Sequence, residues 1–352
     1  MDEMLQHIAE LKPFVTSPTK YAAPENSPEI NSVLTKMVAL SAKIKHDDKV
    51  KSTALQVPAT AFETQLQDAQ RVFNSGNKSY SLWMLRSSLS NCISCHTQMP
   101  AQSTSFAIRN KDQNLVNLFQ EAEFLFIVRN FDKALEFYNK IIGEFPSNKA
   151  LVQDVETAVI RKIFYYTRIS RNLKDLAKSL DNDLKNKNLL PATVAIIKGY
   201  KEAANTIAQE PVPAMTTDAA TRTYAEKILR KELAGGLSYE DSRQNLRNLR
   251  LSGFLYEYLD KHPETNLKPD IYYWLSFCES RWERGLQDSL PELYLKKCVT
   301  EFPSNPVAKK CFKEFKDLMI IGYSGSGGTN IPADVSAEME KMQTLIETRN
   351  GK

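Results

Sequence analysis

Two cysteines and a histidine stand at the end of a segment with clear helical periodicity. Between Ser79 and His96, side chains suited to a core recur at spacings of three and four residues, the repeat of one face of an α-helix. This face comprises Leu82, Leu85, Leu89, Cys92 and His96. The pattern predicts an amphipathic helix that ends in Cys92-Ile93-Ser94-Cys95-His96.

Cys-x-x-Cys-His is the attachment motif of c-type haem. Cys92 and Cys95 can form thioethers with the two vinyl groups of one porphyrin, and His96 can place an imidazole nitrogen on the iron. A redox dithiol and half of a zinc site are the two alternatives. A redox dithiol usually lies near a βαβ pattern, and we find no such pattern here. Zinc needs a second pair of ligands, but the sequence has no other C-x-x-C and no H-x-x-x-H. We therefore predict one covalent haem c.

Four helices are predicted in the first hundred residues. The first spans about 2–12 and ends at Pro13, and a loop rich in Pro, Ser and Asn follows over 14–26. Ser27 caps the second helix, and the third stops at Gly76 before the helix that carries the motif. Short connections favour antiparallel neighbours, so these helices are expected to form an up-down bundle.

A four-helix bundle with C-x-x-C-H at the end of its last helix resembles the class II c-type cytochromes, the cytochrome c′ group. The resemblance covers residues 1–100 and rests on the architecture and the haem motif. It implies that His96 is the proximal iron ligand. It also implies that the sixth ligand is a methionine of the first helix in low-spin members and is missing in high-spin members.

Topology ranks the candidates for a sixth ligand. The last helix runs antiparallel to the first, so the motif is expected beside the start of the first helix, where Met4 lies on the apolar face. His7 flanks the same stripe, Met37 is expected in the core, and His46 is expected in a solvated loop. Met99 follows the motif so closely that it needs a sharp chain reversal. Met4 is therefore the expected ligand.

After a linker at 101–111, the sequence changes to paired helical segments. Residues 114–148 resemble a tetratricopeptide repeat, with Ala122, Ala134, Tyr138 and Pro146 at the offsets of that pattern. The resemblance implies stacked helix pairs that present a groove for a protein or peptide partner. A spacer or an oligomerisation surface is the alternative use of such an array.

One pentapeptide occurs twice in this part of the chain. Glu-Phe-Pro-Ser-Asn closes a predicted helix at 144–148 and again at 301–305. Between them, helix pairs near 150–187 and 190–233 lack the consensus residues. We therefore predict an all-α protein in which an N-terminal four-helix bundle is followed by a tetratricopeptide-like α-solenoid over 112–320.

Cys298 and Cys311 are predicted to form a disulfide. Each cysteine lies six or seven residues from the turn between two helices, so an antiparallel pair brings them to one level. The alternative is that these two cysteines are small buried residues with no bond between them. Cys278 is expected to be a free buried thiol.

Two other clusters are assigned to packing or solvent. Arg243, Arg247 and Arg250 share one helical face, which we expect to be solvated, with a patch for an anionic partner as the alternative. The aromatic residues are expected to pack one repeat on the next; they are Tyr272, Tyr273, Trp274 and Trp282.

The last part of the chain, 321–352, begins with a segment rich in glycine and serine. Gly322–Gly328 lacks the Gly-Lys-Ser/Thr ending of a phosphate loop, and Ser324 is not in a G-x-S-x-G pattern. We expect a flexible connector and then a capping helix from about Pro332 to Arg349, with Met339, Met342 and Ile346 on its inner face.

Charge and compartment narrow the classes of function. The 46 Lys and Arg nearly balance the 42 Asp and Glu, which argues against a general nucleic-acid binder. No apolar run is long enough to span a membrane. Thioether attachment and a disulfide both fit a compartment outside the cytoplasm. We therefore expect a periplasmic or secreted protein. The first residues contain no leader pattern, so we expect that its signal peptide has been removed.

Three functions are compatible with these features. The first is electron transfer, or haem-based redox or gas sensing, coupled to a protein partner and a redox partner. The second is a periplasmic assembly scaffold in which haem is secondary or absent. The third is a peroxidase-like activity, which needs an open distal position and an acid–base residue that we do not identify. We expect an electron-transfer or sensor protein rather than an enzyme.

Overall fold

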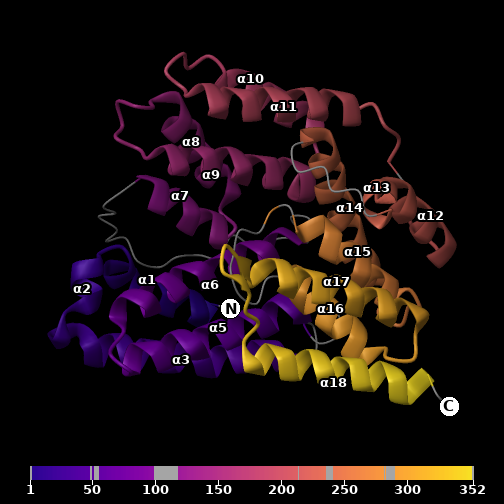
Figure 1. Cartoon of the computed structure of the whole chain (residues 1–352). Helices are drawn as coiled ribbons and strands as arrows, with labels where there is room; N and C mark the ends of the chain where they lie inside the picture. Colours follow the sequence, from indigo (N-terminus) through magenta and orange to yellow (C-terminus); the bar gives the residue numbers. More distant parts are fainter. Residues whose placement is uncertain are drawn as a thin grey trace. The chain divides into compact units, whose positions relative to one another are not determined.

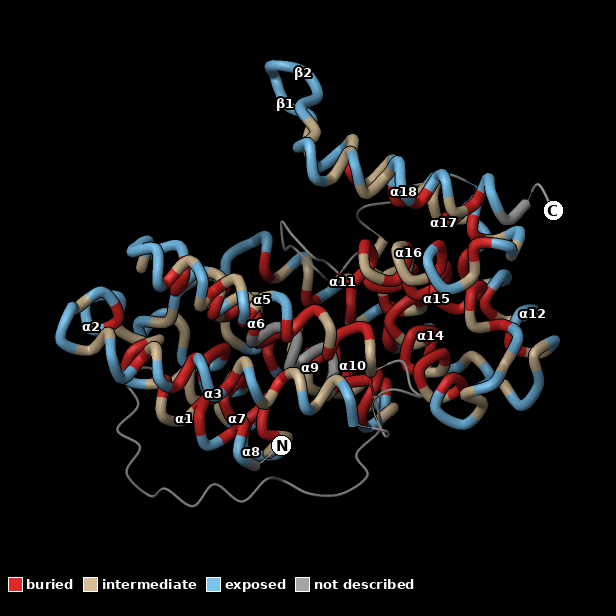
Figure 2. The backbone as a smooth tube through the Cα atoms, turned by 90° about the horizontal axis from the view of Figure 1, so that it is seen from below, coloured by how far each residue is buried: buried red, intermediate tan, exposed pale blue. Residues whose placement is uncertain are grey.

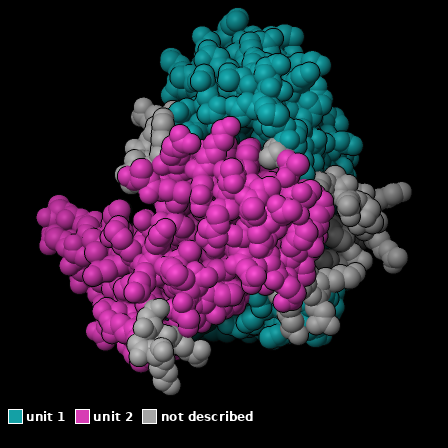
Figure 3. Space-filling model, turned by 90° about the vertical axis from the view of Figure 1, so that its right-hand side faces the viewer, with its two compact units in different colours: residues 1–212, 240–253 teal, residues 213–239, 254–352 magenta. Residues whose placement is uncertain are grey.

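The protein is built of α-helices, as the periodicity predicts. The computed structural model describes residues 2–47, 50, 55–98, 118–212, 214–234, 241–280, 282 and 290–350. Within these ranges almost every element is helical, and the exception is one short β-hairpin near the C-terminal end (Figure 1). The chain divides into two compact units, residues 1–212 with 240–253 and residues 213–239 with 254–352 (Figure 3).

The first five helical elements and the motif helix form one packed group in the first unit. They are α1 (Asp2–Val15), α2 (Pro18–Ala22), η1 (Pro24–Asn26), α3 (Ser27–His46), α5 (Gln56–Asn74) and α6 (Lys78–Gln98). Helix α1 packs on α3, α3 packs on α5, and α5 packs on α6, which also contacts α1. The apolar stripes explain this packing, because side chains such as Ile30, Leu66 and Leu85 are fully enclosed.

Helix α1 is longer than the sequence predicts. It continues through Pro13 to Val15, whereas Pro13 is expected to end it. A proline removes only one main-chain donor, and the Thr16 N–H still donates to the Lys12 carbonyl at 3.1 Å. Burial of Phe14 in the core favours this additional turn.

The expected loop over 14–26 contains a helical turn. Ser17 caps α2 by accepting a hydrogen bond from the Lys20 N–H, and Pro18 occupies the first turn. The turn buries Tyr21 completely, with its hydroxyl 2.8 Å from Ser81 Oγ of α6. A single buried tyrosine therefore fixes a segment that its composition assigns to a loop.

Paired helices follow in the same unit. They are α7 (Leu118–Ile127), α8 (Phe131–Gly143), α9 (Val152–Phe164), the π-helical turn η2 (Tyr165–Ile169), α10 (Leu173–Asp183) and α11 (Pro191–Ile207). Ala122 of α7 and Ala134 of α8 are fully buried, as close packing of a helix pair requires. Tyr138 of α8 is also buried, and its hydroxyl donates to Glu123 at 2.6 Å.

The two Glu-Phe-Pro-Ser-Asn segments have different local structures. Asn148 Nδ2 donates to the Ile141 carbonyl at 2.8 Å and so satisfies the end of α8. Asn305 instead caps the start of the next helix, because its side chain accepts from the Val307 N–H at 2.9 Å. Both pentapeptides therefore follow the end of a helix, α8 or α16, and in the second copy the asparagine also caps the helix that comes next.

The second unit is also helical. Its elements are α12 (Asp218–Ile228), α13 (Arg230–Leu233), the end of α14 (Ser242–Lys261), α15 (Lys268–Glu279), α16 (Leu290–Glu301), α17 (Pro306–Gly322) and α18 (Ala333–Asn350). Helices α15 and α16 are largely buried, whereas α18 exposes most of its surface (Figure 2). Met342 and Ile346 are buried on the inner face of α18, which packs on α16 and α17.

The expected flexible connector before α18 is a β-hairpin. Strand β1 (Ser324–Gly325) pairs antiparallel with β2 (Gly328–Thr329), with Ser324 opposite Thr329. The two residues between the strands make a tight turn, and Gly328 has φ +100°, which glycine adopts readily. The glycines therefore serve a defined turn within the segment that is expected to connect α17 to α18.

Candidate functional site

The Cys-x-x-Cys-His motif lies in the last turns of α6. An α-helix turns through about 100° per residue, so Cys92, Cys95 and His96 occupy one face of α6. Their side chains lie outside the described part of the structure, and so does that of Leu89. The described backbone therefore places these three positions on one face of the helix and says nothing of their side chains.

Two contacts define how α6 runs relative to the start of the chain. Arg86 donates to the Val15 carbonyl from Nε at 3.0 Å and from Nη2 at 2.6 Å. Five residues earlier in α6, Ser81 contacts Tyr21, which follows Val15 by six residues. Later residues of α6 therefore contact earlier residues of the N-terminal segment, so the two run antiparallel.

This register brings Met4 to the level of the motif. Met4 precedes Val15 by eleven residues, and Thr97 follows Arg86 by eleven. Continued at about 1.5 Å per residue along both helices, this register would bring Met4 level with the turn of α6 that contains His96 and Thr97. Met4 is also buried, with 2% of its surface exposed.

His7 lies one turn after Met4 and contacts a carboxylate on the same helix. Its Nδ1 is 2.7 Å from Glu10 Oε2, and 7% of its surface is exposed. The contact with a carboxylate orients the imidazole along α1. Of the two predicted candidates on α1, His7 has a polar partner, whereas Met4 packs as an apolar side chain.

Met37 of α3 lies at another level along α6. Gln70 of α5 donates to Thr35 Oγ1 at 2.6 Å, and the neighbouring Ala69 carbonyl accepts from Ser81 Oγ at 2.7 Å. Met37 therefore lies near the level of Ser81, which is fifteen residues before His96. His46 at the end of α3 is exposed, as expected, and Met99 lies outside the described residues.

One buried amide beside the motif has no hydrogen bond. Gln98, two residues after His96, is 1% exposed, and neither Nε2 nor Oε1 has a partner among the described residues. Leaving a buried amide unpaired costs about 1–3 kcal/mol for each group. Among the described residues, the end of α6 therefore has a donor and an acceptor without a partner.

Arg86 and Gln98 are not singled out by any pattern in the sequence. Their roles depend on which main-chain oxygen or enclosed space lies opposite them, and this is a property of the packed helices. A polar residue beside an apolar stripe is the only signal, and it is shared by many residues on helix surfaces.

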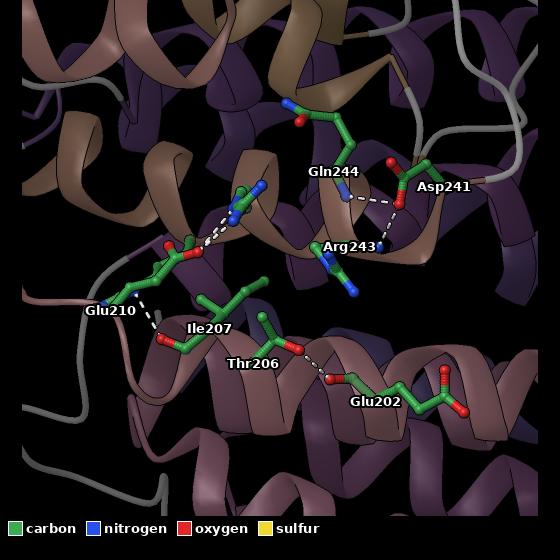
Figure 4. Close-up of polar contacts among 9 residues, drawn as sticks. Glu202, Thr206, Ile207, Glu210, Asp241, Arg243 and Gln244 are labelled. Carbon is green, nitrogen blue, oxygen red and sulfur yellow. Dashed lines mark hydrogen bonds and ion pairs between the residues drawn. The ribbon is translucent and has the colours of Figure 1, made fainter.

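The arginines of α14 are neither a free patch nor a solvated face. Arg247 pairs with Glu210 just after α11, with Nε 3.1 Å from Oε1, and Arg250 Nη1 donates to the Ile207 carbonyl at 3.4 Å. Figure 4 shows Ile207 at the end of α11, Glu210 just after it, and Arg243 on the neighbouring helix. Both arginines therefore join the first part of α14 to the C-terminal end of α11. Arg243 remains the exposed member of the stripe.

Cysteines and aromatic residues of the second unit lie in its core. Cys298 of α16 and Cys311 of α17 are joined by a disulfide, with their Cα atoms 6.3 Å apart. Cys278 is buried and forms no disulfide with a described residue. Tyr272 of α15 packs on Tyr294 and Phe302, with ring centroids 5.8 Å and 6.2 Å apart, so this aromatic cluster joins successive helices.

Comparisons with known proteins do not add a family. No family model, no curated protein and no solved structure matches the chain. Over the described residues, no helix has the length and apolarity needed to cross a membrane. The same part of the chain contains no group of three or more His, Cys, Asp or Glu residues arranged to hold a metal ion. The function must therefore be argued from the motif and its surroundings.

Proposed function

We propose that this protein is an extracytoplasmic monohaem c-type cytochrome with a helical-repeat scaffold. Its role in this proposal is electron transfer, or haem-based redox or gas sensing, coupled to a protein partner. The observation that carries the proposal is the C-x-x-C-H motif on one face of a helix that packs in an α-helical bundle.

The residues at the end of α6 fit a covalently held haem. Cys92 and Cys95 supply two thiols at the spacing of the attachment motif, and His96 supplies the iron ligand beside them. The unpaired amide of Gln98 is an additional donor and acceptor for a polar group bound there. Haem c would supply one-electron redox chemistry at its iron.

Met4 is the proposed sixth ligand. The antiparallel register through Val15 and Arg86 supports this role, because it brings Met4 level with the motif turn. Met37 lies far from that level and serves as core packing. A thioether ligand opposite a histidine raises the reduction potential of a haem iron, which suits an electron carrier.

Two features support the rest of the proposal. The disulfide between Cys298 and Cys311 is typical of an oxidising compartment, which is also where thioether attachment of haem takes place. Helix pairs such as α7–α8 and α16–α17 follow the α-helical group that carries the motif, and arrays of such pairs commonly bind a protein or peptide segment. The proposed architecture is a four-helix haem module followed by a tetratricopeptide-like solenoid.

Optical spectra of the full chain matured with the c-type haem machinery test the proposal. We expect a haem spectrum in the wild type, and a sharp reduced α band if Met4 completes the coordination. His96→Ala should abolish the native ferrous spectrum. Met4→Ala should convert it to a high-spin form, whereas Met37→Ala, a matched change of a buried methionine, should leave it intact.

Each contrary result has a defined meaning. An unchanged ferrous spectrum in His96→Ala would remove the ligand assignment. Identical spectra in Met4→Ala and Met37→Ala would remove Met4 while leaving the haem, and an open position would then favour sensing. A protein that acquires no haem would favour an assembly scaffold, the second candidate, because the helix pairs and the disulfide stand without the cofactor.

A further inference from the structure

A cavity lies within the first unit, and no residue of the haem motif is among the described residues that line it. Its volume is 460 Å³, and it lies where α1 and α6 face α7 and the start of α9. Most of its wall is apolar, and the main contributors are Ile8, Leu11, Val15, Met37, Leu85 and Phe119. The volume is within the range of about 300–1,000 Å³ that is typical of small-molecule sites.

Lys12 of α1 lines this cavity with an unsatisfied ammonium group. Only 14% of its side chain is exposed, and Nζ makes no hydrogen bond to any described residue. Its nearest carboxylate oxygen, Glu121 Oε2, is 3.8 Å away, which is longer than a hydrogen bond. The Phe124 ring, with its centroid 4.7 Å from Nζ, gives the charge partial compensation only.

Burial without hydrogen bonds disfavours the charged form of this lysine. Desolvation lowers the pKa of Lys12, and the nearby Glu121 opposes that effect. An ammonium group has three donors, and the loose ion pair with Glu121 leaves donor capacity for a ligand that enters the cavity. An acceptor with a negative charge would give the Lys12 ammonium a further partner and favour its charged form.

The other charged groups of the wall also favour an anion. Arg86 and Arg161 line the cavity together with Lys12. Glu123, one of the two acidic residues of the wall, is paired through both oxygens with Arg161, at 2.9 Å for the closest contact. Burial raises the pKa of Asp154, the other acidic residue, which also disfavours negative charge on the protein side.

We propose that this cavity binds an amphipathic carboxylate, namely a single acyl chain whose carboxylate contacts Lys12. The apolar side chains of α1, α6 and α7 enclose the chain, and the ammonium group selects the carboxylate head. The site rests on described residues alone and does not depend on haem attachment, so it extends the proposed function to a second ligand. Leu85 and Arg86 precede Cys92 by about two turns of α6, so both sites share one helix.

Titration calorimetry on the full chain tests the site, with decanoate as the probe below its micelle-forming concentration. Decanol and decylamine carry the same chain with a neutral and a cationic head. We expect decanoate to bind most tightly and decylamine least. Affinity should rise about fourfold with each methylene from hexanoate upward until the cavity is filled, since each buried methylene contributes a constant increment.

Substitutions at one position decide the role of the ammonium group. Lys12→Met keeps the length and the apolar stem, and it should weaken decanoate binding more than tenfold while leaving decanol binding unchanged. Lys12→Arg should retain the preference for the carboxylate. Lys20→Met, at an exposed lysine of α2, is the matched control and should not change any of the affinities.

A measurement that does not depend on calorimetry guards against loss of the fold. Decanoate should raise the urea midpoint of the wild type and of Lys20→Met, but not that of Lys12→Met, because a ligand stabilises the state that binds it. The proposal is overturned if decylamine binds as tightly as decanoate, if Lys12→Met binds decanoate like the wild type, or if none of the three probes binds.

Discussion

Arg86 of α6 donates two hydrogen bonds to the main-chain oxygen of Val15, the last residue of α1, at 3.0 Å and 2.6 Å. A helix leaves its last carbonyls without internal partners, and a cation is favoured at that end. The contact therefore completes the C-terminus of α1. It also joins α1 to the helix that carries the motif, and this register is the basis for proposing Met4 as the sixth ligand.

Loss of this contact should weaken the packing of α1. Arg86→Met should lower the free energy of unfolding by about 1 kcal/mol, because the guanidinium is exposed and water can replace part of its hydrogen bonding. Arg71→Met, which removes an exposed pair with Asp68, should cost less than about 0.5 kcal/mol. Equal urea midpoints for the two variants would show that the Arg86 contact does not stabilise α1.

A buried ion pair holds α9 to the end of α10. Lys162 Nζ contacts both carboxylate oxygens of Asp183 at 2.7 Å, and both side chains are almost fully enclosed. Lys162→Met alone should cost about 3–5 kcal/mol, since it leaves a buried carboxylate without its partner. The double variant Lys162→Met, Asp183→Leu should recover most of that loss. Additive losses in urea unfolding would contradict this account.

The disulfide should stabilise the second unit. Its two cysteines are 13 residues apart in sequence, and closing a loop of this size stabilises a fold by about 3 kcal/mol. The double variant Cys298→Ala, Cys311→Ala should lose this amount, and the wild type should lose it in reductant. Cys278→Ala should keep the same sensitivity to reductant as the wild type. If Cys278, Cys298 and Cys311 all react as thiols in the denatured wild type without reductant, the disulfide is excluded.

Alkaline pH should destabilise α15 through its buried phenols. Burial and, to a smaller extent, Glu314 raise the pKa of Tyr273 to about 12. The pKa of this tyrosine is higher in the folded state than the value of about 10 in the unfolded state. Its contribution to the free energy of unfolding is therefore fully present below pH 10 and is lost as the pH rises toward 12. Tyr273→Phe should therefore reduce the loss of stability between pH 10 and 12, whereas Tyr80→Phe, at an exposed position, should not. An unchanged pH profile in Tyr273→Phe would contradict this assignment.

The helices could be predicted where one face repeats over several turns. The stripe of α6 and the inner face of α18 are examples, because burial of Leu85 or of Met342 follows directly from spacing. Predictions were wrong where a single long-range contact decides the local structure. The segment around Tyr21 is expected to be a loop but forms a helical turn. The Tyr21 hydroxyl contacts Ser81, sixty residues away in sequence, and no local pattern predicts this contact.

The surroundings of the candidate sites could be predicted only in part. The haem motif is visible in sequence because its chemistry depends on local spacing, and the disulfide follows from the geometry of one hairpin. The cavity beside Lys12 is formed by helices from two distant parts of the chain, so no local pattern indicates it. The pairing of Arg247 with Glu210 has the same origin, and a charge stripe by itself does not reveal it.

Intact mass measurement of the matured protein under denaturing conditions tests the central proposal most directly. We predict that the wild type carries the mass of one haem, that Cys92→Ala and Cys95→Ala together abolish the adduct, and that Met4→Ala retains it. The cysteines hold the porphyrin covalently, whereas Met4 would bind only the iron. A wild-type protein with the mass of the bare polypeptide, after maturation that loads a control cytochrome, would contradict the haem proposal.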